Sequence, residues 1–135
     1  MLRFARARMA GAGLERADLR QGDMYALPLD EGSADTVVLH QVLHYAQAPA
    51  TAIGEAARLL GAGGRLLIVD FAAHERDELR DREGHARLGF ADEQIEGWFA
   101  VAGLRVGRVD TLAGGELTVK LWLGERGRVA EREAA

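Results

Sequence analysis

The chain has 135 residues, of which 48% are hydrophobic, and this is enough for one α/β domain with a single core. Its formal net charge of −4 argues against a nucleic-acid surface, because phosphate binding needs a basic patch. The absence of cysteine excludes disulfides, zinc–thiolate sites and thiol catalysis, and it fits a cytoplasmic protein. Arginines interrupt the N-terminal segment, so it lacks the apolar core of a signal peptide, and no apolar run is long enough to span a membrane.

The first third of the chain predicts a helix and a short strand. Apolar residues recur at helical spacing between positions 1 and 9, with no capping residue before them, so we expect the chain to begin inside a helix. Ala17 to Gln21 is a strand candidate, and Gly22-Asp23 forms a turn after it. Leu27-Pro28 is a non-helical link, and the polar turn Asp30 to Ser33 leads into the next strand.

Strands and helices alternate in the middle of the chain. The strands are continuously apolar, whereas the helices carry a single apolar stripe or a charged face. In chain order the expected elements are strand Thr36–His40, helix Ala50–Leu60, strand Arg65–Phe71, exposed helix Glu75–Glu83 and helix Asp92–Ala102. Pro49 stands near the start of the first helix, and three glycines between positions 61 and 64 end it. This alternation predicts a mainly parallel sheet covered by helices.

The last strands form an antiparallel hairpin. Leu104–Leu112 and Leu117–Leu123 flank the short glycine-containing loop at 113–116. The second strand alternates, with Leu117, Val119, Leu121 and Leu123 on one face and Thr118, Lys120 and Trp122 on the other. We expect this strand to be buried on both faces and to lie between strand 65–71 and strand 104–112. Residues 124–135 are predicted to be a charged tail.

Three turn segments follow predicted strands, and ligands of open α/β sheets bind beyond the carboxyl ends of the strands. These segments are Gly22–Met24, His40–Gln41 and Asp70–Ala72. Asp70 serves equally well as an acceptor for loop N–H groups. His40 and His44 are four residues apart, but no carboxylate or HExxH spacing accompanies them, so the sequence predicts no metal site.

Two long runs carry a family resemblance. They are GDMYALPLDEGSADTVVLHQVLHY and EAARLLGAGGRLLIVDF, with Gly22-Asp23, Leu27-Pro28, the Glu55-to-Leu60 helix end, Gly63-Gly64 and Asp70 in order. In this combination the chain resembles class I S-adenosylmethionine (SAM) dependent methyltransferases of type 11. The resemblance covers residues 1–123, which it makes a partial methyltransferase domain. It implies a Rossmann-like α/β sheet, mostly parallel, with a C-terminal antiparallel hairpin.

A closer resemblance is to bacterial methyltransferases fused behind an ArsR-type winged-helix repressor domain. The residues that carry it are His74, Glu78-Leu79-Arg80, Gly84-His85, Arg87 to Phe90 and Ala102 to Leu104. It implies a DNA-binding domain upstream of Met1.

Two family features do not occur in this chain. One is the glycine-rich loop after the first strand, where the backbone approaches the methionine part of SAM. The other is the acidic residue that takes the ribose hydroxyls. Gly61 to Gly64 follows a helix and not a strand, so it does not match that loop. We therefore expect the first two strands of the family sheet to be missing, and weak or absent SAM binding by this chain alone.

The resemblance also implies which residues form the site. Cofactor contacts are expected from Gly22, Asp23, Met24, Leu27, His40 and Gln41. Asp23 would accept from the adenine amine and His40 would lie beside the methionine, although Asp23 alone is equally a turn-closing residue. Substrate-side candidates are His44, Tyr45, His74 and His85, with capping, packing or solvent exposure as alternative roles. No catalytic residue is predicted, because methyl transfer from a sulfonium mainly needs orientation and a dry cavity.

The expected activity is methyl transfer to an unidentified small-molecule acceptor. Two other classes stay open: a non-catalytic Rossmann-like remnant, and an oligomerising or regulatory module of an ArsR-type regulator. Thr36 to Leu39 is apolar throughout, and the missing family strands would leave its edge unpaired. We therefore expect self-association, as a homodimer, through this side of the sheet.

Overall fold

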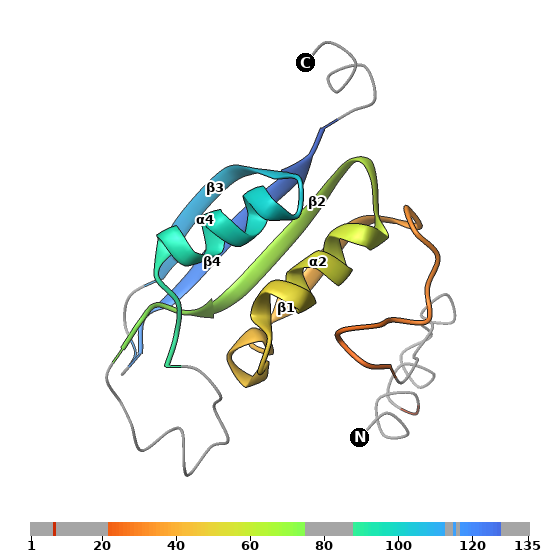
Figure 1. Cartoon of the computed structure of the whole chain (residues 1–135). Helices are drawn as coiled ribbons and strands as arrows, with labels where there is room; N and C mark the ends of the chain where they lie inside the picture. The colour runs from red at the N-terminus through yellow and green to blue at the C-terminus, as the bar shows by residue number, and fades with distance from the viewer. Residues whose placement is uncertain (1–6, 8–21, 75–87, 113–114, 116, 128–135) are drawn as a thin grey trace.

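The computed structural model describes residues 7, 22–74, 88–112, 115 and 117–127 (Figure 1). In chain order these residues form β1 (Ala34–His40), the 3-10 turn η1 (Leu43–Tyr45), α2 (Pro49–Leu59), β2 (Leu60–Phe71), α4 (Asp92–Val101), β3 (Leu104–Leu112) and β4 (Val119–Arg126). The elements expected at 17–21 and 75–83, and all of 1–9 except Ala7, lie outside the described residues.

The strands form one four-stranded sheet with the order β1-β2-β4-β3. β1 and β2 are parallel, with Val38 beside Leu67, whereas β4 runs antiparallel to both β2 and β3. Trp122 of β4 lies between Ile68 and Val109 of its two neighbours. This confirms the expected place of the second hairpin strand, between the third strand and the first hairpin strand. Within the described residues β1 pairs only with β2, and self-association through its other edge stays a prediction.

Some boundaries differ from those expected. β2 begins at Leu60, directly after α2, but Gly63 bends the chain with φ 75 and regular pairing with β1 starts only at Arg65. β4 begins at Val119 and continues to Arg126, three residues past the expected end at Leu123. The predicted tail therefore contributes strand residues, and Arg126 donates from Nη2 to the Ala57 carbonyl of α2 at 2.7 Å.

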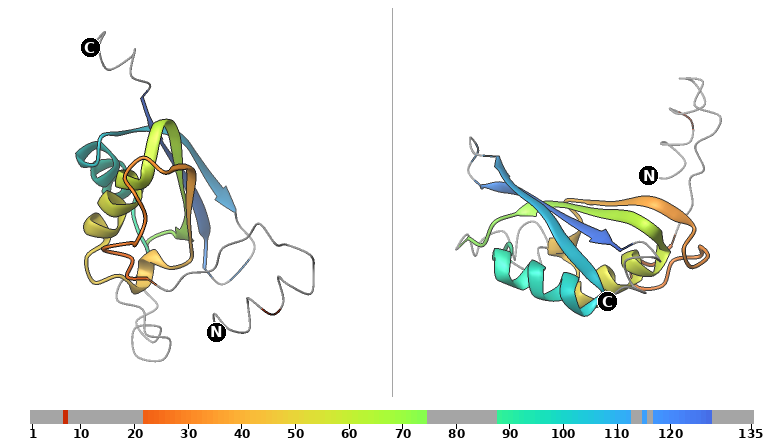
Figure 2. Two further views of the ribbon diagram at one scale, coloured as in Figure 1. Left: turned by 90° about the vertical axis from the view of Figure 1, so that its right-hand side faces the viewer. Right: turned by 90° about the horizontal axis from the view of Figure 1, so that it is seen from above.

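Helices α2 and α4 cover the same face of the sheet, as the two views in Figure 2 show. The core lies between them and the strands. Its largest fully buried side chains are Trp122, Phe90, Phe99, Leu43, Ile53, Leu66, Ile68 and Ile95. No helix of the described segments is long and apolar enough to cross a membrane.

Successive residues of β4 point to opposite faces of the sheet, as expected. Only one of the two faces is fully buried, however, which corrects the expected burial on both. Trp122 points to the helices and is fully buried, whereas Leu121 and Leu123 lie on the opposite face and are only partly buried. Gly124 also faces the helices, because a Cβ at this position would lie 3.0 Å from the Phe99 ring. Trp122, and not Leu121 or Leu123, is therefore the side chain of this strand that packs in the core.

A single carboxylate in the first turn of α4 links this helix to β4. Asp92 accepts from Lys120 Nζ at 2.5 Å and from Trp122 Nε1 at 2.9 Å. These two hydrogen bonds lower the pKa of Asp92. Asp92 lies at the positive end of the helix, which favours a negative charge, and it also satisfies the buried indole N–H, which needs an acceptor.

Candidate functional site

The segment from Gly22 to Asp30, called the 22–30 loop below, carries the first predicted cofactor residues. Asp23 is exposed, and its Oδ1 accepts from the Tyr25 amide at 2.9 Å while its carbonyl accepts from Ala26 at 3.0 Å. Asp23 thus closes a turn, as one of its two sequence-based roles requires. Met24 and Tyr25 are partly buried against the core.

Gly22 lies under the Leu27-Pro28 pair. A Cβ at Gly22 would stand 3.0 Å from Pro28 Cδ and 3.3 Å from Leu27 Cδ2, closer than a side chain packs comfortably. The glycine and the leucine-proline pair are therefore parts of one folded turn. This gives a physical reason for their occurrence together in the sequence.

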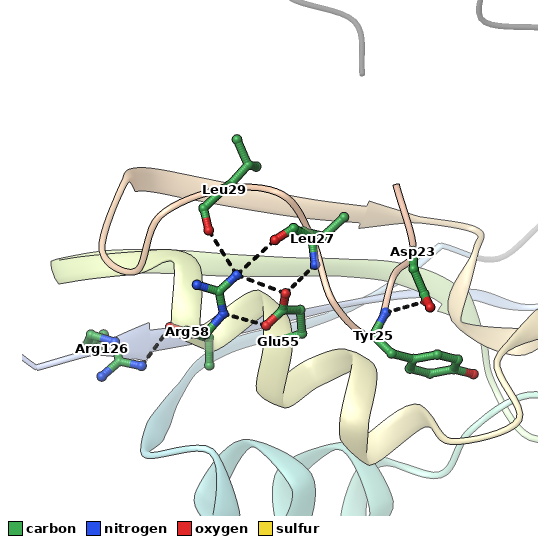
Figure 3. Close-up of polar contacts among 8 residues, drawn as sticks. Asp23, Tyr25, Leu27, Leu29, Glu55, Arg58 and Arg126 are labelled. Atoms are coloured by element: carbon green, nitrogen blue, oxygen red, sulfur yellow. Dashed lines mark hydrogen bonds and ion pairs between the residues drawn. The ribbon is translucent and has the colours of Figure 1, made fainter. Parts of the chain in front are cut away.

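A glutamate and an arginine of α2 hold this loop (Figure 3). Glu55 accepts from the Leu27 amide, and Arg58 Nη2 donates to the carbonyls of Leu27 at 3.1 Å and Leu29 at 3.0 Å. Arg58 also binds Glu55 through Nε and Nη2 at 2.5 and 2.9 Å. The planar guanidinium suits this arrangement because its donors point in fixed directions, which an ammonium group does not provide.

These contacts predict a pH dependence of folding. Hydrogen bonds from the Arg58 side chain and the Leu27 amide lower the pKa of Glu55 from 4.5 to about 2. The depressed pKa means that the carboxylate stabilises the folded state fully above pH 4.5, progressively less as the pH falls toward 2, and not at all below it. We expect Glu55→Gln to flatten the loss of unfolding free energy across this window in urea titrations. Glu96→Gln, which removes an exposed carboxylate of α4, is the control and should keep the wild-type slope. Equal slopes for wild type and Glu55→Gln would contradict the assignment.

β1 ends at the second group of predicted cofactor residues. His40 is exposed at the last position of the strand, and Gln41 has a positive φ of 54. Left-handed backbone is uncommon for a residue with a side chain and occurs often at ligand sites. The Gln41 amide donates to the Val69 carbonyl at 2.7 Å, which fixes this turn to β2.

A buried histidine–aspartate pair lies just after this turn. His44 Nδ1 stands 2.7 Å from Asp70 Oδ1, and the His44 amide donates to Asp70 Oδ2 at 3.2 Å. The Phe71 amide donates to Asp70 as well, at 2.9 Å. His44 is 2% exposed and Asp70 is fully buried. The geometry matches the packing and capping roles left open for these residues, because Asp70 ties η1 to the end of β2.

The other substrate-side candidates are placed differently. Tyr45 is 46% exposed, and its ring centroid lies 4.2 Å from that of His44. The His74 amide donates to the Leu88 carbonyl at 3.0 Å, and its ring meets Phe71 edge-on at 6.3 Å. His85 lies outside the described residues.

One contact joins the two groups of residues. The Tyr25 hydroxyl accepts from the Ala48 amide at 3.2 Å, at the start of α2 and just beyond η1. The 22–30 loop is therefore anchored beside the segment that follows the end of β1. Tyr25, Glu55 and Arg58 were not predicted as site residues. The spacing of Glu55 and Arg58 on one helix is compatible with an ion pair, but it does not indicate that the pair reaches a loop 28 residues away.

The arrangement offers an exposed carboxylate, partly buried apolar side chains and a strained turn at one end of the sheet. Within the described parts of the chain, no group of three His, Cys, Asp or Glu side chains is arranged to hold a metal ion. The chemistry of these groups suits an organic ligand with hydrogen-bond donors and an apolar ring.

Comparison with known proteins places this geometry in context. The sequence pattern of the methyltransferase domain family matches residues 1–68 of the 135. A 37.1 kDa protein in transposon Tn4556 of Streptomyces fradiae, described as uncharacterised, is 39% identical over 62 residues, which are 46% of this chain. The matched segment spans only 18% of that protein.

Solved structures share the fold. A protein of Bacillus halodurans assigned as a methyltransferase superposes with a TM-score of 0.81 at 18% identity, covering 93% of this chain and 78% of that one. A SAM-dependent methyltransferase of Aquifex aeolicus superposes with a TM-score of 0.69 at 18% identity, covering 92% and 62%. The sheet, the hairpin and the helix-covered face are thus those of a Rossmann-like methyltransferase fold, and this family implies SAM as its cofactor. On the match over residues 1–68, half of its length, the chain belongs to the methyltransferase domain family.

Proposed function

We propose that this chain binds the adenosyl part of SAM at the carboxyl end of β1 and serves a methyltransferase that acts on a small-molecule acceptor. The observation that carries the proposal is the Tyr25–Ala48 hydrogen bond. It anchors the loop of Asp23 and Met24 beside the segment that follows His40 and Gln41. Residues that the family resemblance assigns to the cofactor thereby come from neighbouring segments.

The residues present fit the adenine end of SAM. Asp23 supplies an exposed carboxylate for an amine donor, although one of its oxygens already accepts from Tyr25. Met24 and Leu27 are partly buried apolar side chains beside it, suited to the faces of a ring. The resemblance places His40 beside the methionine, and no contact for the ribose is assigned among the described residues. When bound, SAM supplies a methyl group already activated by its sulfonium.

This chain's own residues would orient the reactants and exclude water. Tyr45 is the exposed substrate-side candidate, whereas the buried His44–Asp70 pair fixes the turn that presents it. The fold alone does not fix the acceptor, since related folds support different chemistry. We propose a small molecule because the acidic net charge of −4 disfavours nucleic acid.

The ArsR-fusion resemblance adds a finer proposal, in which this domain follows a winged-helix repressor domain. Its support is the sequence motif, two parts of which lie side by side in the structure. The Ala73 amide donates to the Phe90 carbonyl at 3.1 Å, and the Phe90 amide donates to Phe71 at 2.9 Å. This bridge brings the His74 and Leu88-to-Phe90 parts of the motif side by side.

Calorimetric titration with S-adenosylhomocysteine tests the proposed function. We expect weak binding by the chain alone, with a Kd of about 1 mM, equivalent to about 4 kcal/mol, because only part of the ligand is contacted. Asp23→Ala should weaken this binding about tenfold, as expected for a lost hydrogen bond to an ionised group. Glu96→Ala, which removes an exposed carboxylate of α4 outside this loop, is the matched control. Equal affinities for the two variants, or a flat titration of the wild type, would contradict the proposal.

A further inference from the structure

The 22–30 loop depends on contacts with α2 for its position. Most of its residues are exposed, and only Met24, Tyr25 and Leu27 are partly buried. Its own backbone contributes one short bridge, between Asp23 and Ala26, and one hydrogen bond from the Leu29 amide to the Leu27 carbonyl at 2.8 Å. Such a segment has little apolar burial to resist local opening, so polar contacts decide how well it is held.

Those contacts reach the loop from one helix at two places. Tyr25 accepts from Ala48 at the start of α2, and the Glu55–Arg58 pair grips Leu27 and Leu29 further along. Glu55 is only 9% exposed and Arg58 is 35% exposed, so water competes poorly for the inner part of the pair. Asp23 lies two residues before Tyr25, where the contacts from α2 to the loop begin.

The charges around the Glu55–Arg58 pair favour its contacts with the 22–30 loop. The hydrogen bond to Glu55 raises the pKa of Arg58, and the carboxylates of Asp30 and Glu31 raise it further. Arginine is charged in proteins in any case, and these carboxylates favour the position of its guanidinium between two backbone carbonyls and Glu55. A lysine at this position would keep the charge but lose the fixed fork of donors.

We propose that Glu55 and Arg58 are positioning residues for the cofactor: they set the place of Asp23 through the 22–30 loop without touching the ligand. This inference rests on the proposed function and deepens it. A purely structural pair would stabilise the fold and leave the affinity of the loop for its ligand unchanged. A positioning pair lowers that affinity when it is loosened, even in a chain that stays folded.

The test uses Arg58→Lys and, as a second variant, Glu55→Gln, with Arg105→Lys as the matched control. Arg105 pairs with Glu125 on the exposed surface of β3 and β4, at 3.1 Å. For each protein we would measure amide hydrogen exchange at Leu27, the affinity for S-adenosylhomocysteine, and the urea midpoint of unfolding. Exchange at Ile68, in the buried part of β2, reports global opening.

We expect Arg58→Lys to accelerate exchange at Leu27 and to weaken binding, each by about tenfold, corresponding to one or two lost hydrogen bonds. Exchange at Ile68 should increase much less than exchange at Leu27, and the unfolding midpoint should fall slightly below that of Arg105→Lys, because the lost contacts also stabilise the folded state. Glu55→Gln keeps an acceptor oxygen for the Leu27 amide and should fall between the wild type and Arg58→Lys.

Three results would overturn the inference. They are unchanged exchange at Leu27, faster exchange at Leu27 with unchanged affinity, and an affinity loss matched by faster exchange at Ile68. A wild-type chain that fails to bind would overturn the proposed function and this inference together. That case is recognised from the unsubstituted protein alone, so the two failures are distinguishable.

Discussion

Trp122→Ala should lower the free energy of unfolding by about 3–5 kcal/mol, the usual cost of removing a large buried aromatic side chain. Trp122 is fully buried at the centre of the sheet, between Ile68 and Val109, and its indole N–H donates to Asp92. The variant loses core contacts on β4 and the link from β4 to α4 together. Because small domains are stable by only about 5–15 kcal/mol, we expect a much lower urea midpoint in circular dichroism.

Two further variants separate the contribution of the buried Trp122 ring from that of the opposite face of β4 and from that of the hydrogen bond to Asp92. Leu121→Ala removes a partly buried side chain from the opposite face of β4 and should cost clearly less than Trp122→Ala. Trp122→Phe keeps a ring in the core but loses the hydrogen bond to the ionised Asp92, which is worth about 1.5–3 kcal/mol. If Leu121→Ala lowers the free energy of unfolding as much as Trp122→Ala does, the claim that the core lies on the helix-covered face of β4 is wrong.

Gly89→Ala should also be strongly destabilising, because the backbone leaves no room for a side chain. Gly89 has a φ of 76, and a Cβ there would lie 2.1 Å from the Ala72 carbonyl oxygen. The bridge that joins Phe90 to the end of β2 would have to open or shift, at a cost of about 1–3 kcal/mol or more. Thermal unfolding followed by circular dichroism measures this loss.

Gly97→Ala is the matched control, since it makes the same chemical change in a different environment. Gly97 lies in α4, and nothing stands within 4 Å of a Cβ added there. Alanine is the better helix former, so this variant should gain about 0.5–1 kcal/mol. Opposite signs for the two substitutions are expected, and the same sign for both would count against the described packing of Gly89.

Much of the sheet could be predicted because its signals are local. The alternation in β4 and the short glycine loop before it fixed the hairpin, and the apolar runs at 36–39 and 65–71 marked the parallel strands. The sidedness of β4 could not be read in the same way. One of its faces carries leucines and the other carries Trp122, and only the positions of α2 and α4 decide that the Trp122 face is covered.

The site was predicted less completely, because its contacts join residues distant in the chain. Turns after strands were recognisable, and so Asp23, His40 and Asp70 were selected as a group. The Glu55 contact with Leu27 spans 28 residues, and the His44 pair with Asp70 spans 26. Sequence spacing says which residues share one helix or strand, but not which loop folds back onto them.

The most direct test of the central claim is to map the bound ligand on the chain. We would titrate the 15N-labelled protein with S-adenosylhomocysteine and follow its amide signals by NMR, which detects weak binding. We predict saturable shifts concentrated at residues 22–27 and 40–45, with small shifts at 104–112 on the far edge of the sheet. The absence of saturable shifts, or shifts centred on β3 and β4, would contradict the claim that this end of the sheet is a cofactor site.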